Sequence, residues 1–126
     1  MPPLKFLLRA TAGTFSRKDI DELIELGKTH HLPGVAWIKV GKDLSLESSI
    51  VKYFAAEVQK DLVRAVDAEE NDLLLFAAED FEKAVTGLGQ LRLYIGEKLN
   101  LIKRDAMKFC WVTYFPLFEW SEEENK

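Results

Sequence analysis

The sequence predicts an α+β domain, a two-layer sandwich in which helices cover one face of a mostly antiparallel sheet. Three observations support this fold class. Segments with the two-residue apolar period of strands alternate with segments that have the three- to four-residue period of helices. The chain has 126 residues, 48% of them hydrophobic, which suits one ordinary domain with one core. No repeat or long linker interrupts the predicted order of strand, helix, strand, helix, strand, helix, strand.

The start of the chain predicts a half-buried strand followed by a helix. Residues 4–11 alternate between apolar side chains and polar or charged ones, as a strand with one solvated face does. Ser16 and Asp19 are three residues apart and predict a capping box, in which hydroxyl and carboxylate satisfy free amides at the helix start. The helix is expected to end near residues 32–34. Its predicted buried face consists of Ile20, Leu23, Ile24 and Gly27.

The middle of the chain predicts two further strands with a helix between them. Val35 to Val40 alternates and is followed by a glycine turn. A second helix is predicted from about Ser49 to the acidic turn at residues 67–71. Its apolar residues recur at four-residue steps: Ile50, Phe54, Val58 and Leu62. Leu73 to Ala78 is continuously apolar, which indicates a central strand buried on both faces.

A third helix is predicted to begin at Asp80. Its apolar stripe consists of Phe81, Val85, Leu88, Leu91, Ile95 and Leu99. Gly87, Gly89 and Gly96 interrupt this stripe, although glycine is unfavourable inside a helix. We expect close approach to the helix backbone at these glycines, where a side chain would collide with the sheet or with a neighbouring body; the alternative is a helix that breaks near Gly89.

The last strand is predicted at residues 108–114, which are apolar and rich in aromatic side chains. Cys110 lies inside this run, so we expect it in the core rather than in a reactive site. Because the chain has one cysteine, an internal disulfide is excluded and a reducing compartment is expected.

Charge and hydropathy limit the classes of function. The formal net charge is −4 and basic residues are scattered, which argues against strong independent binding of nucleic acid. The best basic clusters are Arg17-Lys18 and Lys103-Arg104 with Lys108, and a solvated face is the preferred interpretation of them. The longest apolar run, residues 73–78, is far shorter than the ~20 residues that cross a bilayer. We expect neither a membrane span nor a signal peptide.

No set of residues predicts catalysis or metal binding. A Ser/His/acid set, a Cys-x-x-Cys motif and a phosphate-binding glycine loop are all missing from the sequence. His30 and His31 are adjacent, so on a helix they point about 100° apart and do not chelate one ion. They are expected at a helix C-terminus, where cationic histidine complements the helix dipole. Glu79 and Asp80 are expected to open the third helix, where negative charge is favourable.

Several segments, in order along the chain, resemble one protein family. They are residues 16–23 (SRKDIDEL), 34–40 (GVAWIKV), 48–54 (SSIVKYF), 72–78 (DLLLFAA), 87–93 (GLGQLRL), 99–102 (LNLI) and 111–119 (WVTYFPLFE). Together they are similar to the GAD domain that is inserted into bacterial-type aspartyl-tRNA synthetase. The last of these segments resembles the point at which the chain of that enzyme re-enters the catalytic core.

Four positions depart from the pattern of that family. Tyr114 replaces the usual Asp, Ser49 replaces Pro and Asn100 replaces Gly, while residues 67–71 replace a more glycine-rich turn. The change at Tyr114 bears most on function, because it removes a carboxylate at the predicted junction with the core.

The resemblance implies a DCoH-like two-layer fold, with the GAD domain at residues 1–115 and a frayed re-entry segment toward the core at 116–126. It implies an accessory, non-catalytic part of a class II ligase that attaches aspartate to tRNA(Asp). That parent enzyme would use ATP and Mg, whereas this chain alone would need no cofactor and would not be an enzyme. The resemblance also implies a cytoplasmic, homodimeric parent whose catalytic core and tRNA are the partners of this domain, without a membrane.

Two sets of site residues follow from the resemblance. Candidates that face tRNA near the acceptor stem are Arg17, Lys103 and Arg104. Candidates that pack against the catalytic core are Phe115, Pro116, Phe118 and Trp120.

Two other functions stay open at this point. The GAD module also occurs in the B subunit of a tRNA-dependent amidotransferase. Alternatively, the chain is a free-standing interaction protein, in which Phe115, Phe118 and Trp120 form an apolar patch that binds a partner or drives dimers.

Overall fold

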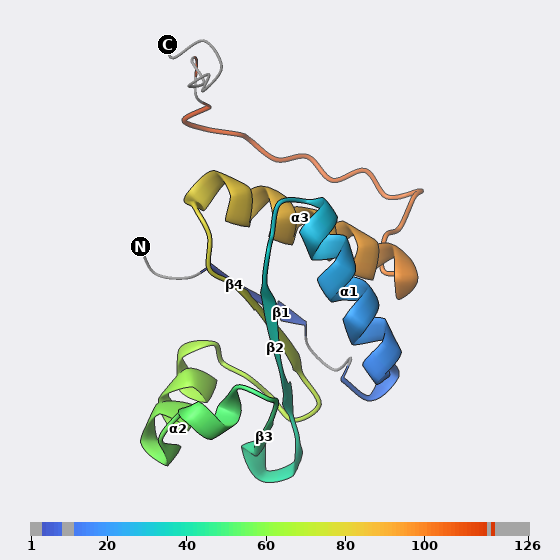
Figure 1. The fold of residues 1–126 in the computed structure, drawn as a ribbon. Helices are drawn as coiled ribbons and strands as arrows, with labels where there is room; N and C mark the ends of the chain where they lie inside the picture. Colours follow the sequence, from blue (N-terminus) through green and yellow to red (C-terminus); the bar gives the residue numbers. More distant parts are fainter. Residues whose placement is uncertain (1–3, 9–11, 116, 118–126) are drawn as a thin grey trace.

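The computed structural model describes residues 4–8, 12–115 and 117, and shows a four-stranded sheet with three α-helices (Figure 1). The strands are β1 (Leu4–Leu8), β2 (Val35–Val40), β3 (Leu46–Glu47) and β4 (Leu73–Ala77). The helices are α1 (Arg17–Thr29), α2 (Ala56–Ala65) and α3 (Phe81–Lys98). Short 3-10 turns lie at Ala12–Thr14, Lys42–Leu44 and Val51–Tyr53. No helix in these described ranges is both long and apolar enough to cross a membrane.

The sheet has the order β1-β4-β2-β3, and every neighbouring pair is antiparallel. β4 is central: Leu75 lies opposite Phe6 of β1 on one side and opposite Trp37 of β2 on the other. β3 pairs only with Lys39 and Val40 at the end of β2. The antiparallel sheet and the α+β class are as predicted, and β4 is the central strand that its continuous apolar sequence indicated.

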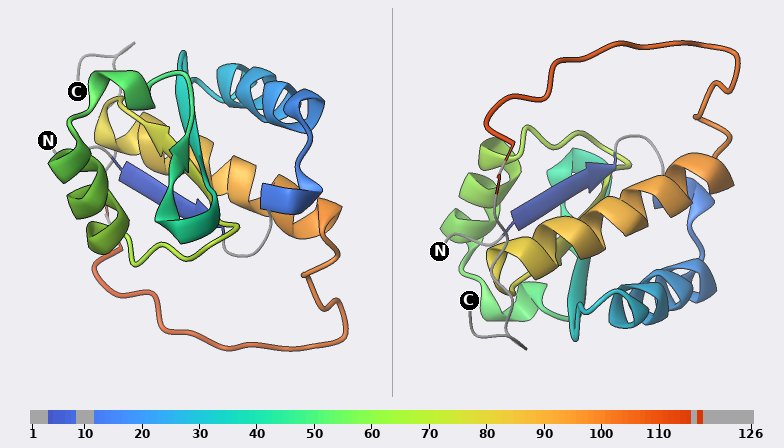
Figure 2. Two further views of the ribbon diagram at one scale, coloured as in Figure 1. Left: turned by 90° about the horizontal axis from the view of Figure 1, so that it is seen from below. Right: turned by 90° about the horizontal axis from the view of Figure 1, so that it is seen from above.

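One face of the sheet is covered by α1 and α3 (Figures 1 and 2). The buried residues of this main core are Phe15, Ile20, Leu23, Leu32, Val35, Leu73, Leu75, Ala77, Leu88, Leu91 and Ile95. On the same face, the Lys39 ammonium donates to the Phe15 carbonyl at 2.7 Å and ties β2 to the segment before α1. The helical layer predicted for one face is therefore formed by α1 and α3.

The remaining helix, α2, packs against a second and smaller core. This core contains Ile38, Val40, Val63, Ala68 and Leu74. Ile38 and Leu74 alternate along their strands with the residues of the main core, so this cluster lies on the opposite face. The prediction that helices lie on one face holds for α1 and α3 but not for α2, because the two faces of the central strands are both apolar.

Helix α1 begins as its sequence predicts. The Asp19 amide donates to the Ser16 hydroxyl oxygen at 3.2 Å, and the Ser16 amide donates to the Asp19 carboxylate at 2.8 Å. The capping box is thus complete. The helix ends at Thr29, with His30 as its C-cap, so the two histidines lie at the helix C-terminus as predicted.

Helix α2 differs from its prediction. It begins at Ala56 rather than near Ser49, after a separate 3-10 turn. Phe54 and Val58 of the predicted stripe are 37% and 49% exposed, whereas Val63 is buried. The four-residue spacing was therefore misleading, because it joined a turn and a helix that present different faces to the core.

The glycines of α3 have different surroundings. A Cβ at Gly87 would collide with the Leu32 side chain and lie 3.0 Å from the His30 carbonyl oxygen, so the predicted close approach is confirmed there. A Cβ at Gly96 would lie 3.3 Å from Ile102. A Cβ at Gly89 would meet no atom within 4 Å among the described residues, and α3 continues through it without a break. The predicted break near Gly89 is therefore wrong and no described segment approaches Gly89 closely, while approach by a neighbouring body stays a prediction.

The predicted last strand is not formed. The part of the chain described after α3, residues 101–115, contains no strand and all its side chains are exposed. Phe109, Trp111 and Tyr114 are 93%, 96% and 101% exposed. Cys110 is exposed as well, so its predicted place in the core is wrong. None of the four strands pairs with this segment. The burial that its apolar sequence indicated would therefore require another body as its partner.

Candidate functional site

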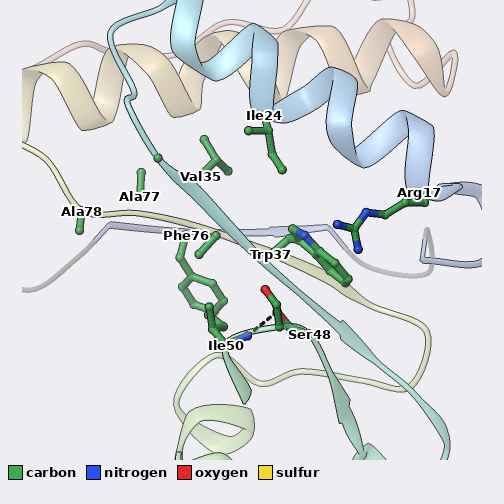
Figure 3. A pocket seen from close by; sticks show the side chains of 12 residues that line it. Arg17, Ile24, Val35, Trp37, Ser48, Ile50, Phe76, Ala77 and Ala78 are labelled. Atoms are coloured by element: carbon green, nitrogen blue, oxygen red, sulfur yellow. Dashed lines mark hydrogen bonds between the residues drawn. The ribbon is translucent and has the colours of Figure 1, made fainter. Parts of the chain in front are cut away.

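Arg17 is the one predicted tRNA-facing residue that lies within the folded body. It occupies the first turn of α1, and its Nε lies 3.4 Å from the Asp21 carboxylate. Its guanidinium carbon lies 5.3 Å from the centroid of the Trp37 ring, which is cation–π distance (Figure 3). Arg17 therefore pairs with Asp21 of its own helix and lies over the Trp37 ring of β2.

Beside Arg17 is an open hollow of about 570 Å³. It lies between α1, the first half of β2 and the segment that follows β3 (Figure 3). Its lining is mainly apolar and includes Ile24, Val35, Trp37, Ile50, Phe76 and Ala78, with Ser48 and Ser49 at one side. The Ile50 amide donates to the Ser48 hydroxyl oxygen at 3.4 Å. The hollow offers one cation and an apolar wall, which suits binding rather than bond breaking.

The hollow follows from an unpaired stretch of sheet edge. β3 pairs with β2 only at Lys39 and Val40, so residues 35–38 have no strand on that side among the described residues. The peptide groups of Val40 form hydrogen bonds on the β4 side. Its amide donates to the Asp72 carbonyl oxygen, and its carbonyl oxygen accepts from the Asn71 amide. Since hydrogen bonding alternates along a strand, the peptide groups of Val35 and Trp37 face the open edge. No local pattern indicated this open edge, because strand pairing is a long-range property.

The shortest ion pair among the described residues joins the first turn of α1 to the last turn of α3. The Lys98 ammonium lies 2.5 Å from Asp19 Oδ1 and 3.3 Å from Glu22 Oε2. Lys98 and Ser16 hold the pKa of Asp19 well below its ordinary value. In turn, hydrogen bonding to Asp19 holds the pKa of Lys98 above its ordinary value. The Tyr94 ring lies 5.7 Å from the same ammonium.

This contact was not predicted, although Asp19 was predicted as a cap. Asp19 and Lys98 are 79 residues apart, and no local pattern pairs them. Their side chains are only 23% and 31% exposed, so solvent reaches the pair only in part. We interpret the contact as a structural clasp, since each charge already has an opposite partner.

The other two basic candidates lie outside the helices and strands. Lys103 and Arg104 are exposed, in the segment that follows α3. The described structure contains no ion pair from either side chain and no contact that joins them to Arg17. The role of Arg17, Lys103 and Arg104 in facing tRNA therefore stays a prediction.

The candidates for packing against a core lie at the end of the chain. Phe115 is 80% exposed, and its neighbour Leu117 is 86% exposed. Pro116, Phe118 and Trp120 lie outside the described residues, as does most of the predicted re-entry segment. The packing role and the domain boundary at residue 115 stay predictions.

Metal chemistry finds no support in the described part of the chain. No group of three or more His, Cys, Asp or Glu side chains is placed there so that it could hold a metal ion. Asp72 is fully buried, and its carboxylate accepts the Glu69 amide at 2.7 Å. This buried carboxylate fixes the turn before β4 and was not singled out from the sequence.

Comparisons with known proteins place this architecture in a family. Residues 5–88 match the GAD domain. An aspartate–tRNA(Asp/Asn) ligase of Persephonella marina is 45% identical over 112 residues, which are 89% of this chain and 18% of the relative. An aspartate–tRNA ligase of Bacillus licheniformis is 44% identical over 119 residues, 94% of the chain and 20% of the relative. An aspartate–tRNA(Asp/Asn) ligase of Syntrophotalea carbinolica is 40% identical over 123 residues, 98% of the chain and 21% of the relative.

The chain spans about a fifth of the length of these curated relatives. A match over 98% of the chain includes the exposed segment after α3, so this segment is part of the similarity. Because the family match runs from β1 into the first half of α3, the chain belongs to the GAD domain family.

Proposed function

We propose that this chain is the insertion domain of an aspartate–tRNA ligase and serves as an accessory, non-catalytic part of it. The activation of aspartate with ATP and Mg, and its transfer to tRNA(Asp), would be carried out by the rest of that enzyme. The enzyme would act in the cytoplasm as a homodimer. The relatives described above are named as aspartate–tRNA ligases, which favours this parent over an amidotransferase subunit.

One observation supports the proposal most strongly: the exposed apolar segment that follows α3. A solvated run with Phe109, Trp111 and Tyr114 is unfavourable, because burying one such ring contributes about 1.5–3 kcal/mol. The segment resembles the synthetase chain where it returns to the catalytic core. We infer that these side chains are buried in the parent enzyme and that they join the domain to it.

The described residues also support a role without catalysis. The titratable groups with clearly shifted pKa, Asp19 and Lys98, pair with each other and stabilise the helix packing. Neither lines the hollow beside Arg17. A shifted pKa in a cleft would favour a catalytic acid or base, whereas these two shifted groups join two helices.

For tRNA, we propose a shaping role near the acceptor stem rather than strong independent binding. A net charge of −4 and the small number of basic residues in each cluster favour few phosphate contacts. Titration of the isolated chain with tRNA(Asp) transcript at several salt concentrations checks this. Sub-micromolar affinity at physiological salt would contradict it.

The proposed function is tested in a hybrid enzyme. In the ligase of Bacillus licheniformis, the 119 aligned residues are replaced by the matching residues of this chain. A second hybrid has a flexible Gly/Ser linker in place of residues 4–98 and keeps the segment after α3. We expect the first hybrid to aminoacylate tRNA(Asp), and the linker hybrid to keep aspartate-dependent pyrophosphate exchange with a raised KM for tRNA. Loss of exchange in the linker hybrid would assign the domain a catalytic part.

A further inference from the structure

One side of α3 carries an apolar stripe that the domain itself leaves uncovered. Phe81, Val85 and Leu93 are 51%, 46% and 50% exposed, and Gly89 lies between the last two at the same four-residue step. We call these four residues the free flank of α3. The buried face of the helix, with Ala84, Leu88, Leu91 and Ile95, is a different one.

The opposite flank of α3 has a partner. Tyr94 and Lys98 contact Glu22 of α1, and Lys98 also contacts Asp19. Figure 2 shows α1 along one side of α3 and the segment after α3 passing on the other side. The two flanks of α3 thus differ. The flank with Tyr94 and Lys98 packs against α1, whereas the free flank is exposed to solvent.

Gly89 is the feature that points to a partner. Gly87 is explained inside the domain by the approach of Leu32 and the His30 carbonyl. Gly89 has open space where its Cβ would lie, so nothing among the described residues accounts for a glycine, which is unfavourable relative to alanine within a helix. At the centre of an exposed apolar stripe, a glycine allows another surface to approach the backbone.

On the same side of α3, a neighbouring side chain does approach the helix backbone closely at another glycine, Gly96. Gly96 follows Gly89 by seven residues, two helical turns, and so lies on the same side of α3. Ile102, at the start of the exposed segment, packs there, with its Cγ1 3.3 Å from the Cβ position of Gly96. The exposed segment therefore begins on the free flank, and the two surfaces are continuous.

We propose that the free flank of α3 is the docking face of this domain for an apolar surface of the remaining body of its parent ligase. The inference rests on the proposed function. The body is the occupant that fits, because the aromatic segment leading to it starts on this flank and about four-fifths of the relatives lies outside this chain. Docking covers Phe81, Val85 and Leu93, with the partner closest to the helix at Gly89.

The test compares amide hydrogen exchange of α3 in the isolated chain and in the first hybrid. We expect exchange at residues 85–93 to be about tenfold slower or more in the hybrid, because docking removes local opening. Val85→Lys should abolish that difference. The matched control is Val58→Lys on α2, a helical valine with nearly the same exposure, 49% against 46%, which should leave it unchanged. Circular dichroism of both isolated variants checks that each is folded.

The outcomes separate the two proposals. A hybrid that aminoacylates tRNA but gives α3 no added protection, or one in which Val58→Lys acts like Val85→Lys, overturns the docking face and leaves the proposed function standing. A hybrid that does not aminoacylate contradicts the proposed function itself. Dimers of the isolated chain in sedimentation that Val85→Lys disperses would reassign the flank to a second copy and overturn the proposal. Protection in the hybrid that Val85→Lys alone removes supports it.

Discussion

The Lys98 ammonium at the end of α3 lies between the carboxylates of Asp19 and Glu22 in the first turns of α1, 2.5 Å from the nearer one. This contact fixes one end of the helical layer. Because Asp19 also completes the capping box of α1, one carboxylate serves both the start of a helix and the packing of two helices.

The clasp predicts how stability depends on pH. Because the pKa of Asp19 is lowered on folding, its contribution is present above the ordinary value of 3.8 and is lost as pH falls toward the folded value. The pKa of Lys98 is raised, so its contribution is present below 10.5 and is lost as pH rises above it. We expect Asp19→Asn to flatten the acid limb of stability against pH. Urea midpoints from pH 7 to pH 2 measure this.

The control for that experiment is Asp43→Asn. Asp43 is exposed, contacts no cation among the described residues and has a positive φ that asparagine also accepts. An acid limb equally flattened by Asp43→Asn would show that the clasp is not its cause.

Removing the N-cap of α1 should destabilise the domain. The Ser16 hydroxyl accepts the Asp19 amide, so Ser16→Ala leaves that amide without its partner. We expect a loss of about 1 kcal/mol in the free energy of unfolding. Chemical denaturation checks it, with the exposed Ser49→Ala as control; equal effects of the two substitutions would argue against the cap.

Substitution by alanine should lower the free energy of unfolding at Gly87 and raise it at Gly89. Gly87→Ala pushes a methyl into Leu32 and the His30 carbonyl and should cost about 1–3 kcal/mol. Gly89→Ala meets open space in the isolated chain and should gain about 0.5–1 kcal/mol from helix propensity. Thermal unfolding of both variants measures the pair. A destabilising Gly89→Ala in the isolated chain would contradict the open surroundings of that residue.

Two leucines of α3 should also differ. Leu91 is fully buried, so Leu91→Ala should cost about 2–5 kcal/mol, because it leaves a cavity between helix and sheet. Leu93 is 50% exposed, and Leu93→Ala should change the isolated chain by less than about 0.5 kcal/mol. Denaturant midpoints compare the two, and similar losses would mean that the free flank is covered within the chain.

Local signals predicted much of this fold. The capping box at Ser16 and Asp19, the strand from Val35 to Val40 and the buried strand from Leu73 follow from neighbouring residues, and the structure confirms them. Helix and strand periods depend on near neighbours, so one sequence suffices to find them.

Properties set by distant residues were missed. The clasp between Asp19 and Lys98 depends on how two helices cross, and the open edge of β2 depends on where β3 leaves it. The apolar residues 108–114 indicated burial but not its partner. The same is true of Phe81 and Val85, whose spacing suggested the core and whose exposure suggests a surface to be covered.

The central claim is that this chain is an accessory part of a ligase and not an enzyme by itself. Aspartate-dependent exchange of pyrophosphate into ATP tests it most directly, measured on the isolated chain and on the hybrid that carries it. We expect exchange and tRNA aminoacylation by the hybrid and neither by the isolated chain. Exchange by the isolated chain, or a hybrid that folds but does not aminoacylate tRNA(Asp), would contradict the account.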